Sequence, residues 1–232
     1  MDNQNDTQVN DVTAAPPAAA VQARLKRTRL LTRFSIILAI EAIFCFTPLG
    51  SIPIGPIVAT LAVVPVVITG VLLGARAGGL MGFFAGLFSF VVWTFTPPSP
   101  MAFIFTPFYS VGGVHGNLWS LAICFVPRIL VGAVAGGLYF ILGRFFKAGK
   151  GRSVTLLVSG FFGSMTNTAL VLAGIYIFFG HQYMDALGQA YSALLGFLAL
   201  TFATNGLMEA AIAALAALFV GRAAMFFTRK NS

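Results

Sequence analysis

The chain has 232 residues, of which 58% are hydrophobic and 9% are charged, and its mean hydropathy is +0.92. Soluble domains carry about a quarter charged residues, so the composition excludes an ordinary soluble domain and indicates a membrane protein. The formal net charge of +8 does not indicate a nucleic-acid partner, because the basic residues lie beside long apolar runs, where they act as topology signals.

The first segment, residues 1–22, is polar and then rich in Ala and Pro, and it contains no aromatic residue. A segment of this composition cannot bury enough apolar surface to offset the entropy of folding. We therefore predict a disordered cytoplasmic tail, followed by one membrane domain in residues 23–232. The acidic start, with no short apolar core directly behind it, does not match a cleavable signal peptide.

Six apolar runs follow, and each is close to or above the ~20 residues needed to cross a bilayer. In chain order they are residues 30–47, 57–74, 77–95, 119–143, 153–180 and 190–220. We predict an all-α polytopic membrane protein with six transmembrane helices. The last two runs exceed one bilayer thickness, so we expect them to tilt or to extend beyond the membrane.

The basic residues are distributed unevenly between the connecting segments. Of the 14 Lys and Arg residues, all except Arg128 fall on one side of the membrane if the six spans alternate. The opposite loops, residues 48–56, 96–118 and 181–189, contain neither Lys nor Arg. Because cytoplasmic loops are enriched in basic residues, we predict that both termini are cytoplasmic. The first two opposite loops are rich in Pro, Gly and aromatic residues, and they either fold over a cavity or serve as tight connectors.

Small residues recur at a spacing of four in several runs, which allows helices to approach closely. We interpret most of these strips as internal packing surfaces. They are Gly78, Gly82 and Gly86 in the third run, Gly132 and Gly136 in the fourth, and Gly160, Ser164 and Thr168 in the fifth. Ser35 and Ala39 in the first run, like an Ala-rich strip in the sixth, either pack internally or dock a second membrane protein.

Five polar residues interrupt the apolar runs, and we predict that they form a solute-binding site: Glu41, Arg128, Asn167, Asn205 and Glu209. A charge at the centre of a bilayer costs at least ~2.5 kcal/mol, so such residues face a protein interior or a wet cavity. Arg128 lies about nine residues from the outer end of its run, which is roughly 13 Å at 1.5 Å per residue. That depth is suitable for a solute site.

Each of these residues also has a structural interpretation. Arg128 either binds a ligand or pairs with Glu209 or Glu41 to hold helices together. Amides such as Asn167 also join membrane helices by hydrogen bonds. Asn205 and Glu209 are four residues apart and share a helix face. For Glu209 we favour a role as the counter-charge of Arg128, or as a coupling residue, over direct contact with a ligand. Glu41 has a structural role or a role in the site.

Pro127 directly precedes Arg128. It removes a helical hydrogen bond and frees the carbonyl of Ile123, and we expect it to bend the fourth span and open room for a solute. We interpret Trp93, Trp119 and Tyr109 as interfacial anchors at the outer surface.

The motifs of common enzymes do not occur in the sequence. We find no GxxxxGK[ST] phosphate loop, no HExxH and no paired cysteine motif. We therefore predict that the chain is not an enzyme and needs no metal or cofactor, and that it does not hydrolyse ATP by itself.

Several stretches together resemble the substrate-binding S components of energy-coupling factor (ECF) transporters. They are FTPLGSIPIGPIVATLAVVPVVITGVLLGARAGGLMGFFAGLFSF (46–90), VPRILVGAVAGG (126–137), GSMTNTALVLAGIY (163–176) and NGLMEA (205–210). The sequence is most similar to the pantothenate-type branch, with one departure: Val64 stands where that branch often has His before the Pro of the second span.

The resemblance implies a mechanism and partners. An S component binds a vitamin from outside and docks with a module of one membrane coupling subunit and two cytoplasmic ATPases in the cell membrane of a prokaryote. In that family, small residues of the first span contact the coupling subunit, and Ser35 and Ala39 are the matching positions, with Ser in place of the more usual Ala. For pantothenate, Arg128 would bind the carboxylate, and Asn167 and Asn205 would serve hydroxyl or amide groups.

Three other interpretations remain open from the sequence. The solute is another vitamin, such as folate, riboflavin or a pyridoxine-like compound. Alternatively, the chain is a self-sufficient secondary transporter with Glu41 or Glu209 as proton carrier, although no clear two-fold repeat relates its halves. An integral membrane enzyme acting on lipid is the least favoured, because His, Asp and Cys do not cluster in the sequence.

Overall fold

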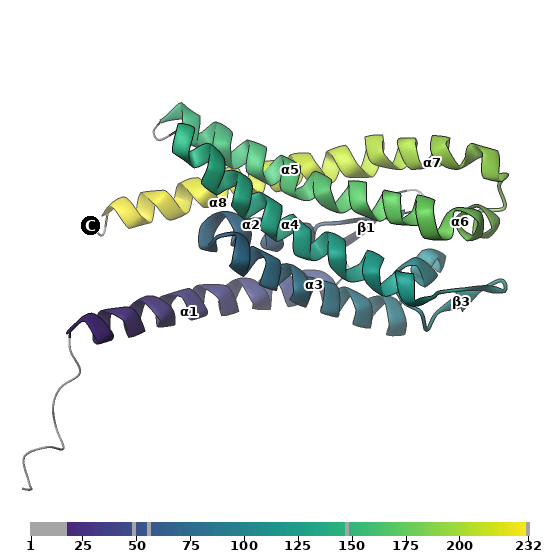
Figure 1. Ribbon diagram of the computed structural model, residues 1–232, viewed down its shortest axis with the longest axis horizontal. Helices are drawn as coiled ribbons and strands as arrows, with labels where there is room; N and C mark the ends of the chain where they lie inside the picture. The colour runs from purple at the N-terminus through teal and green to yellow at the C-terminus, as the bar shows by residue number, and fades with distance from the viewer. Residues whose placement is uncertain (1–17, 48–49, 55–56, 147–148, 231–232) are drawn as a thin grey trace, which may run out of the picture.

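Long apolar helices dominate the computed structural model, which describes residues 18–47, 50–54, 57–146 and 149–230. Within these residues, six helical segments run along the length of the molecule (Figure 1). The first four are α1 (Ala18–Phe46), α2 (Val63–Leu73), α3 (Ala75–Phe95) and α4 (Leu118–Phe145). The fifth comprises α5 (Lys150–Gly174), the π-helical turn η3 (Ile175–Phe179) and α6 (Gly180–Ala186). The sixth comprises η4 (Tyr191–Ala193), α7 (Leu194–Thr201), the π-helical turn η5 (Phe202–Gly206) and α8 (Leu207–Lys230).

The predicted six-helix, all-α membrane fold is confirmed. Among the described residues, four segments are long and apolar enough to cross a membrane: Ala75–Phe95, Leu118–Phe145, Lys150–Ala186 and Tyr191–Phe227. α2 is apolar but has only 11 residues. α1 is long, but its first half carries the basic residues that open the membrane domain.

Two predicted boundaries need correction. α1 begins at Ala18, so residues 18–22, which we predicted to be disordered, are helical; the run of Ala in this segment favours helix. The rest of that predicted tail, residues 1–17, lies outside the described residues. The second predicted span also starts too early, because Ile57–Thr60 forms strand β2 and the helix begins at Val63. Ile, Val and Thr favour strands, and Pro65 is tolerated only because it lies in the first turn of α2.

The predicted outer loops contain short regular elements. Strand β1 (Ser51–Ile54) pairs antiparallel with β2, although residues 48–49 and 55–56 of this loop lie outside the described part of the chain. The longer loop contains the 3-10 helix η2 (Pro100–Ile104) and a hairpin of β3 (Ser110–Val111) and β4 (Val114–His115). Gly112 and Gly113 both have positive φ, as a two-residue hairpin turn requires.

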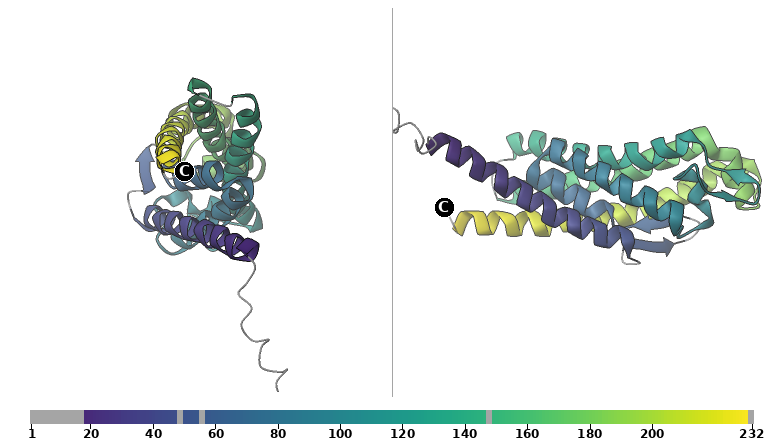
Figure 2. Two further views of the ribbon diagram at one scale, coloured as in Figure 1. Left: turned by 90° about the vertical axis from the view of Figure 1, so that its left-hand side faces the viewer. Right: turned by 90° about the horizontal axis from the view of Figure 1, so that it is seen from below.

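The helices are arranged around α4. It packs against α3, α5 and α2, while α8 packs against α5 and α2. α1 lies at the edge of the bundle against α3 and α2 (Figure 2). The start of α1 and the end of α8 lie at one end of the bundle, and the β3–β4 hairpin and α6 lie at the opposite end (Figure 1). We call the latter the hairpin end.

The close contact of α3 with α4 depends on glycine. A Cβ at Gly132 would collide with the backbone of Gly78, and a Cβ at Gly82 would collide with the carbonyl of Arg128. Likewise, a Cβ at Gly160 would meet the backbone of α8 at Ala213. The prediction that these strips serve internal packing is therefore confirmed, and the α3 strip brings this helix directly against the turn that carries Arg128.

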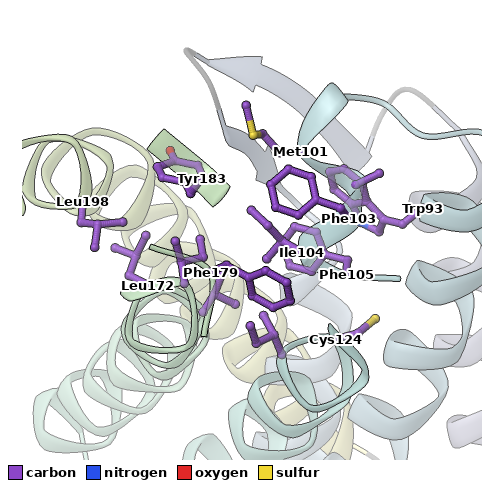
Figure 3. Close-up of a cluster of buried hydrophobic side chains, with 14 of the residues drawn as sticks. Trp93, Met101, Phe103, Ile104, Phe105, Cys124, Leu172, Phe179, Tyr183 and Leu198 are labelled. Atoms are coloured by element: carbon purple, nitrogen blue, oxygen red, sulfur yellow. The ribbon is translucent and has the colours of Figure 1, made fainter. Parts of the chain in front are cut away.

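A hydrophobic cluster fills the hairpin end (Figure 3). Its centre is the loop segment Met101–Phe105, in which each residue is at most 6% exposed. The Ser120 hydroxyl donates a 2.7 Å hydrogen bond to the carbonyl of Phe103, and the Thr94 and Thr106 hydroxyls lie 2.8 Å apart. This segment is therefore fixed between the helices, so of the two alternatives left open for this loop, a tight connector does not describe it.

Candidate functional site

The bundle contains a cavity next to this hydrophobic cluster. It encloses about 470 Å³ of space between atoms, its opening to the outside included. Its wall is formed by residues from α3, the long outer loop, α4, α5, α7, η5 and α8: Trp93, Phe105, Arg128, Asn167, Thr168, Val171, Leu172, Thr201, Asn205 and Glu209. Four of the five predicted site residues, which are up to 81 positions apart in sequence (209 − 128), therefore surround one space.

A second, smaller cavity adjoins the first. Arg128 and Asn167 line both, so these two side chains stand between the two spaces. The other residues of the second wall are mainly small and apolar: Ala62, Val63, Val66, Ala85, Ser89 and Val131. Arg128 and Asn167 are therefore the central polar residues of the site.

The structure explains why Pro127 and Arg128 stand side by side within a membrane span. Pro127 has no N–H, so the carbonyl of Ile123, one helical turn earlier, loses its usual donor. The Nη1 atom of Arg128 donates a 3.0 Å hydrogen bond to this carbonyl. The guanidinium thus occupies the acceptor that the proline frees, and it is held against α4 with further N–H groups available beside the cavity.

Two aromatic rings form the wall beside Arg128. The Cζ atom of Arg128 lies 5.1 Å from the centroid of the Phe105 ring, and the Phe105 and Trp93 rings are 4.7 Å apart at an interplanar angle of 31°. Both aromatic residues are 6% exposed. The interpretation of Trp93 as an interfacial anchor is therefore wrong: its ring lies inside the bundle, because it faces the inserted loop segment and not the lipid.

Asn167 carries an unused acceptor. It lies on α5 and is 8% exposed, and its Oδ1 atom has no hydrogen-bond partner among the described residues. A buried polar atom without a partner costs about 1–3 kcal/mol. Since Asn167 lines both cavities, a solute that supplies a donor there would remove this cost.

The sixth helical segment contributes an amide and a carboxylate. Asn205 and Glu209 are 4% and 5% exposed, and both line the larger cavity. Asn205 belongs to the π-helical turn η5, and its Oδ1 atom lies 3.3 Å from the Thr204 hydroxyl. Such turns are frequent at functional sites, because the extra residue changes the direction of the side chains that follow.

Glu41 is placed differently from the other four predicted residues. It is fully buried on α1 and is not among the residues that line either cavity. Its Oε1 atom accepts a 3.3 Å hydrogen bond from the Cys45 thiol, and it is close enough to Arg128 for electrostatic attraction. The structure therefore brings Glu41 near the site but does not place it on the wall of either cavity.

Ser35 and Ala39 lie on the outer face of α1, and both are exposed. They share this face with large apolar side chains such as Ile36, Ile40 and Ile43, which are 57%, 42% and 55% exposed. The sequence left two alternatives for Ser35 and Ala39, internal packing or contact with a second membrane protein. Their exposure is not consistent with internal packing. The strip is accessible from the surrounding membrane.

Four residues of the cavity wall were not predicted from the sequence: Phe105, Trp93, Thr168 and Thr201. The available signal for Phe105 was its loop, MAFIFTP, which is too apolar for a segment in water. Together the wall offers one guanidinium, one carboxylate, two amides and two hydroxyls against an apolar surface. This arrangement suits a small solute that carries an anionic group and several hydrogen-bonding groups.

Comparison with known proteins agrees with this geometry. The family model described as "ECF transporter, substrate-specific component" matches residues 29–221. The "Pantothenic acid transporter PanT" of Lactococcus lactis subsp. cremoris is 40% identical over 159 residues, which cover 68% of this chain and 73% of that protein. The chain is therefore a multi-pass membrane protein that belongs to the family of substrate-specific components of ECF transporters.

Proposed function

We propose that this chain is the pantothenate-binding subunit of an ECF-type vitamin importer. One observation carries the proposal: the cavity contains an intramembrane guanidinium, Arg128, beside the amide of Asn167. Pantothenate carries one carboxylate, one amide and two hydroxyls, and these groups match the side chains of the wall. The similarity to the PanT protein of Lactococcus lactis supports the choice of this vitamin.

The residues divide the binding between them. Arg128 binds the carboxylate by charge-assisted hydrogen bonds, which are stronger than neutral ones. Asn167 and Asn205 bind the hydroxyl and amide groups, and the apolar wall formed by Val171 and Leu172 contacts the carbon skeleton. Glu209 supplies a negative charge that offsets part of the charge of Arg128 when no vitamin is bound.

Transport requires partners. A membrane coupling subunit docks against α1, and two cytoplasmic ATPases supply the energy for delivery of the vitamin to the cytoplasm. Both termini face the cytoplasm, since the start of α1 and the end of α8 lie at the end of the bundle that also carries the basic ends of α4 and α5, with Arg144 and Arg152 (Figure 1). The vitamin enters from the hairpin end.

Uptake of labelled pantothenate separates this proposal from a self-sufficient secondary transporter. The chain is expressed in cells that cannot take up pantothenate, with and without a coupling module. The proposal predicts uptake only with the module. Uptake without any coupling ATPase would contradict it and would favour a proton-coupled carrier that uses Glu41 or Glu209.

Asn167→Leu is expected to weaken pantothenate binding about tenfold, since a lost hydrogen bond of this kind costs roughly 1–3 kcal/mol. The thermal stability of the unliganded protein should not fall, because the Oδ1 atom that is removed has no partner among the described residues. Thr166→Val is the control, since Thr166 lies on the same helix but its hydroxyl bonds to the carbonyl of Phe162. Unchanged affinity in the Leu variant would remove Asn167 from the site.

Ala39→Trp is expected to abolish uptake and to leave pantothenate binding by the isolated chain unchanged. A large side chain at this exposed position of α1 would hold the coupling subunit away from the helix. Ala211→Trp, at an exposed position of α8, is the matched control and should transport normally. Normal uptake by the Ala39 variant would show that the coupling subunit docks elsewhere.

A further inference from the structure

The ring of Phe105 faces the cation that the proposed function assigns to the carboxylate of the vitamin. This residue comes from the long outer loop, whereas Arg128 comes from the middle of α4. The Cζ atom of Arg128 lies 5.1 Å from the ring centroid, within the ~6 Å at which cation–π attraction operates. Phe105 is also part of the cavity wall.

Phe105 is held in place by its ring, by its backbone and by the next residue in the chain. Its ring packs on Trp93 at 4.7 Å. Its backbone N–H donates a 2.9 Å hydrogen bond to the carbonyl of Ala102, and the next residue, Thr106, meets the Thr94 hydroxyl at 2.8 Å. Only 6% of its surface is exposed, so neighbouring atoms leave the ring little room to change its rotamer.

The guanidinium of Arg128 is therefore held on two sides. The Ile123 carbonyl accepts from Nη1 at 3.0 Å, and the Cζ atom lies over the Phe105 ring, 5.1 Å from its centroid. A guanidinium has five N–H groups along its edge, and an aromatic face contacts the plane without using any of them. This arrangement fixes the orientation of the cation and leaves edge N–H groups for a carboxylate.

We propose that Phe105 is a positioning residue that orients Arg128 for the carboxylate of the solute, and that it thereby determines selectivity for an anionic over a neutral ligand. This inference rests on the proposed function. It assigns to the inserted loop a specific contribution to recognition: the loop supports the charged residue of the site as well as covering the cavity.

The competing explanation is that Phe105 only fills space. The two explanations differ in their dependence on ligand charge. A ring that only packs would affect every ligand of the cavity equally. A ring that orients Arg128 would affect the anionic vitamin and not an analogue without the carboxylate.

The test uses the purified full chain and two ligands, pantothenate and panthenol, in which a primary alcohol replaces the carboxylate. Dissociation constants are measured for the unsubstituted chain, Phe105→Leu and Phe105→Tyr. The Leu variant keeps apolar volume but lacks a π face, and it is expected to bind pantothenate about tenfold more weakly and panthenol within twofold of the unsubstituted chain. The Tyr variant keeps the ring and should restore most of the pantothenate affinity.

Equal changes for both ligands, or no change for either, would overturn the inference. If thermal unfolding shows that the Leu variant does not fold, Phe105→Met provides the same comparison with a more adaptable side chain. Failure of the unsubstituted chain to bind pantothenate would overturn the proposed function and this inference with it. Binding by the unsubstituted chain with no ligand-dependent effect at Phe105 would overturn the inference alone.

Discussion

Arg128→Ala is expected to weaken pantothenate binding by about 100-fold or more. Removing one partner of a buried, hydrogen-bonded charge pair costs about 2–5 kcal/mol, and the ligand carboxylate would be left in a cavity whose other charged wall residue is an acid, Glu209. The measurement is equilibrium binding of labelled pantothenate to the purified chain in detergent. Panthenol affinity should fall much less, because that analogue carries no charge.

Two further variants show whether the effect belongs to the site. Arg128→Lys keeps the charge but loses the planar fork, so its affinity should lie between those of the unsubstituted chain and the Ala variant. Arg144→Ala is the control: this residue lies in the last turn of α4, with its Cζ atom 4.5 Å from the ring centroid of Phe140, and its removal should not affect binding. Pantothenate affinity within a factor of two in the Arg128→Ala variant would contradict the assignment of the carboxylate.

Gly132→Val is expected to destabilise the helix bundle strongly. The added side chain would meet the backbone of Gly78 on α3, including its carbonyl oxygen, and backbone cannot rearrange cheaply. Overpacking costs about 1–3 kcal/mol or more, so the midpoint of thermal unfolding in detergent should fall by about 5–10 °C. Loss of this contact would also move α3 away from the turn that carries Arg128.

Gly137→Val is the matched control on the same helix. A Cβ at Gly137 has no neighbour within 4 Å among the described residues, while the effect of a β-branched residue on helix propensity is the same at both positions. The unfolding midpoint of this variant should stay within about 2 °C of the unsubstituted chain. Equal destabilisation by the two variants would mean that helix propensity, and not contact with α3, explains the loss.

Much of the fold follows from local sequence patterns. Apolar length predicted the helices, and the spacing of Gly78, Gly82 and Gly132 predicted where they approach closely. The second span was predicted less well, because a run of apolar residues does not distinguish strand β2 from helix α2. The start of α1 was misplaced for a related reason: an Ala-rich segment has little apolar surface but high helix propensity.

Candidate site residues could be predicted from the sequence where a polar side chain is costly to bury in a membrane span. They could not be predicted where tertiary contacts determine which side chains line the cavity. Arg128, Asn167, Asn205 and Glu209, which line one cavity, could be selected from the sequence because a polar side chain within a membrane span is costly. Phe105 was missed, because its contact with Arg128 depends on how a loop folds back into the bundle. Glu41 met the same criterion as the four cavity residues, yet helix packing places it outside the wall of either cavity.

The most direct test of the proposed function is equilibrium binding by the purified chain alone, without ATP, across a panel of labelled vitamins that includes pantothenate, folate, riboflavin and pyridoxine. We predict saturable binding of pantothenate, with much weaker binding of the other three. Tight binding of a different vitamin would still agree with a solute-binding subunit, but it would contradict the assignment of Arg128 to the pantothenate carboxylate. Binding of none of them would contradict the proposed function.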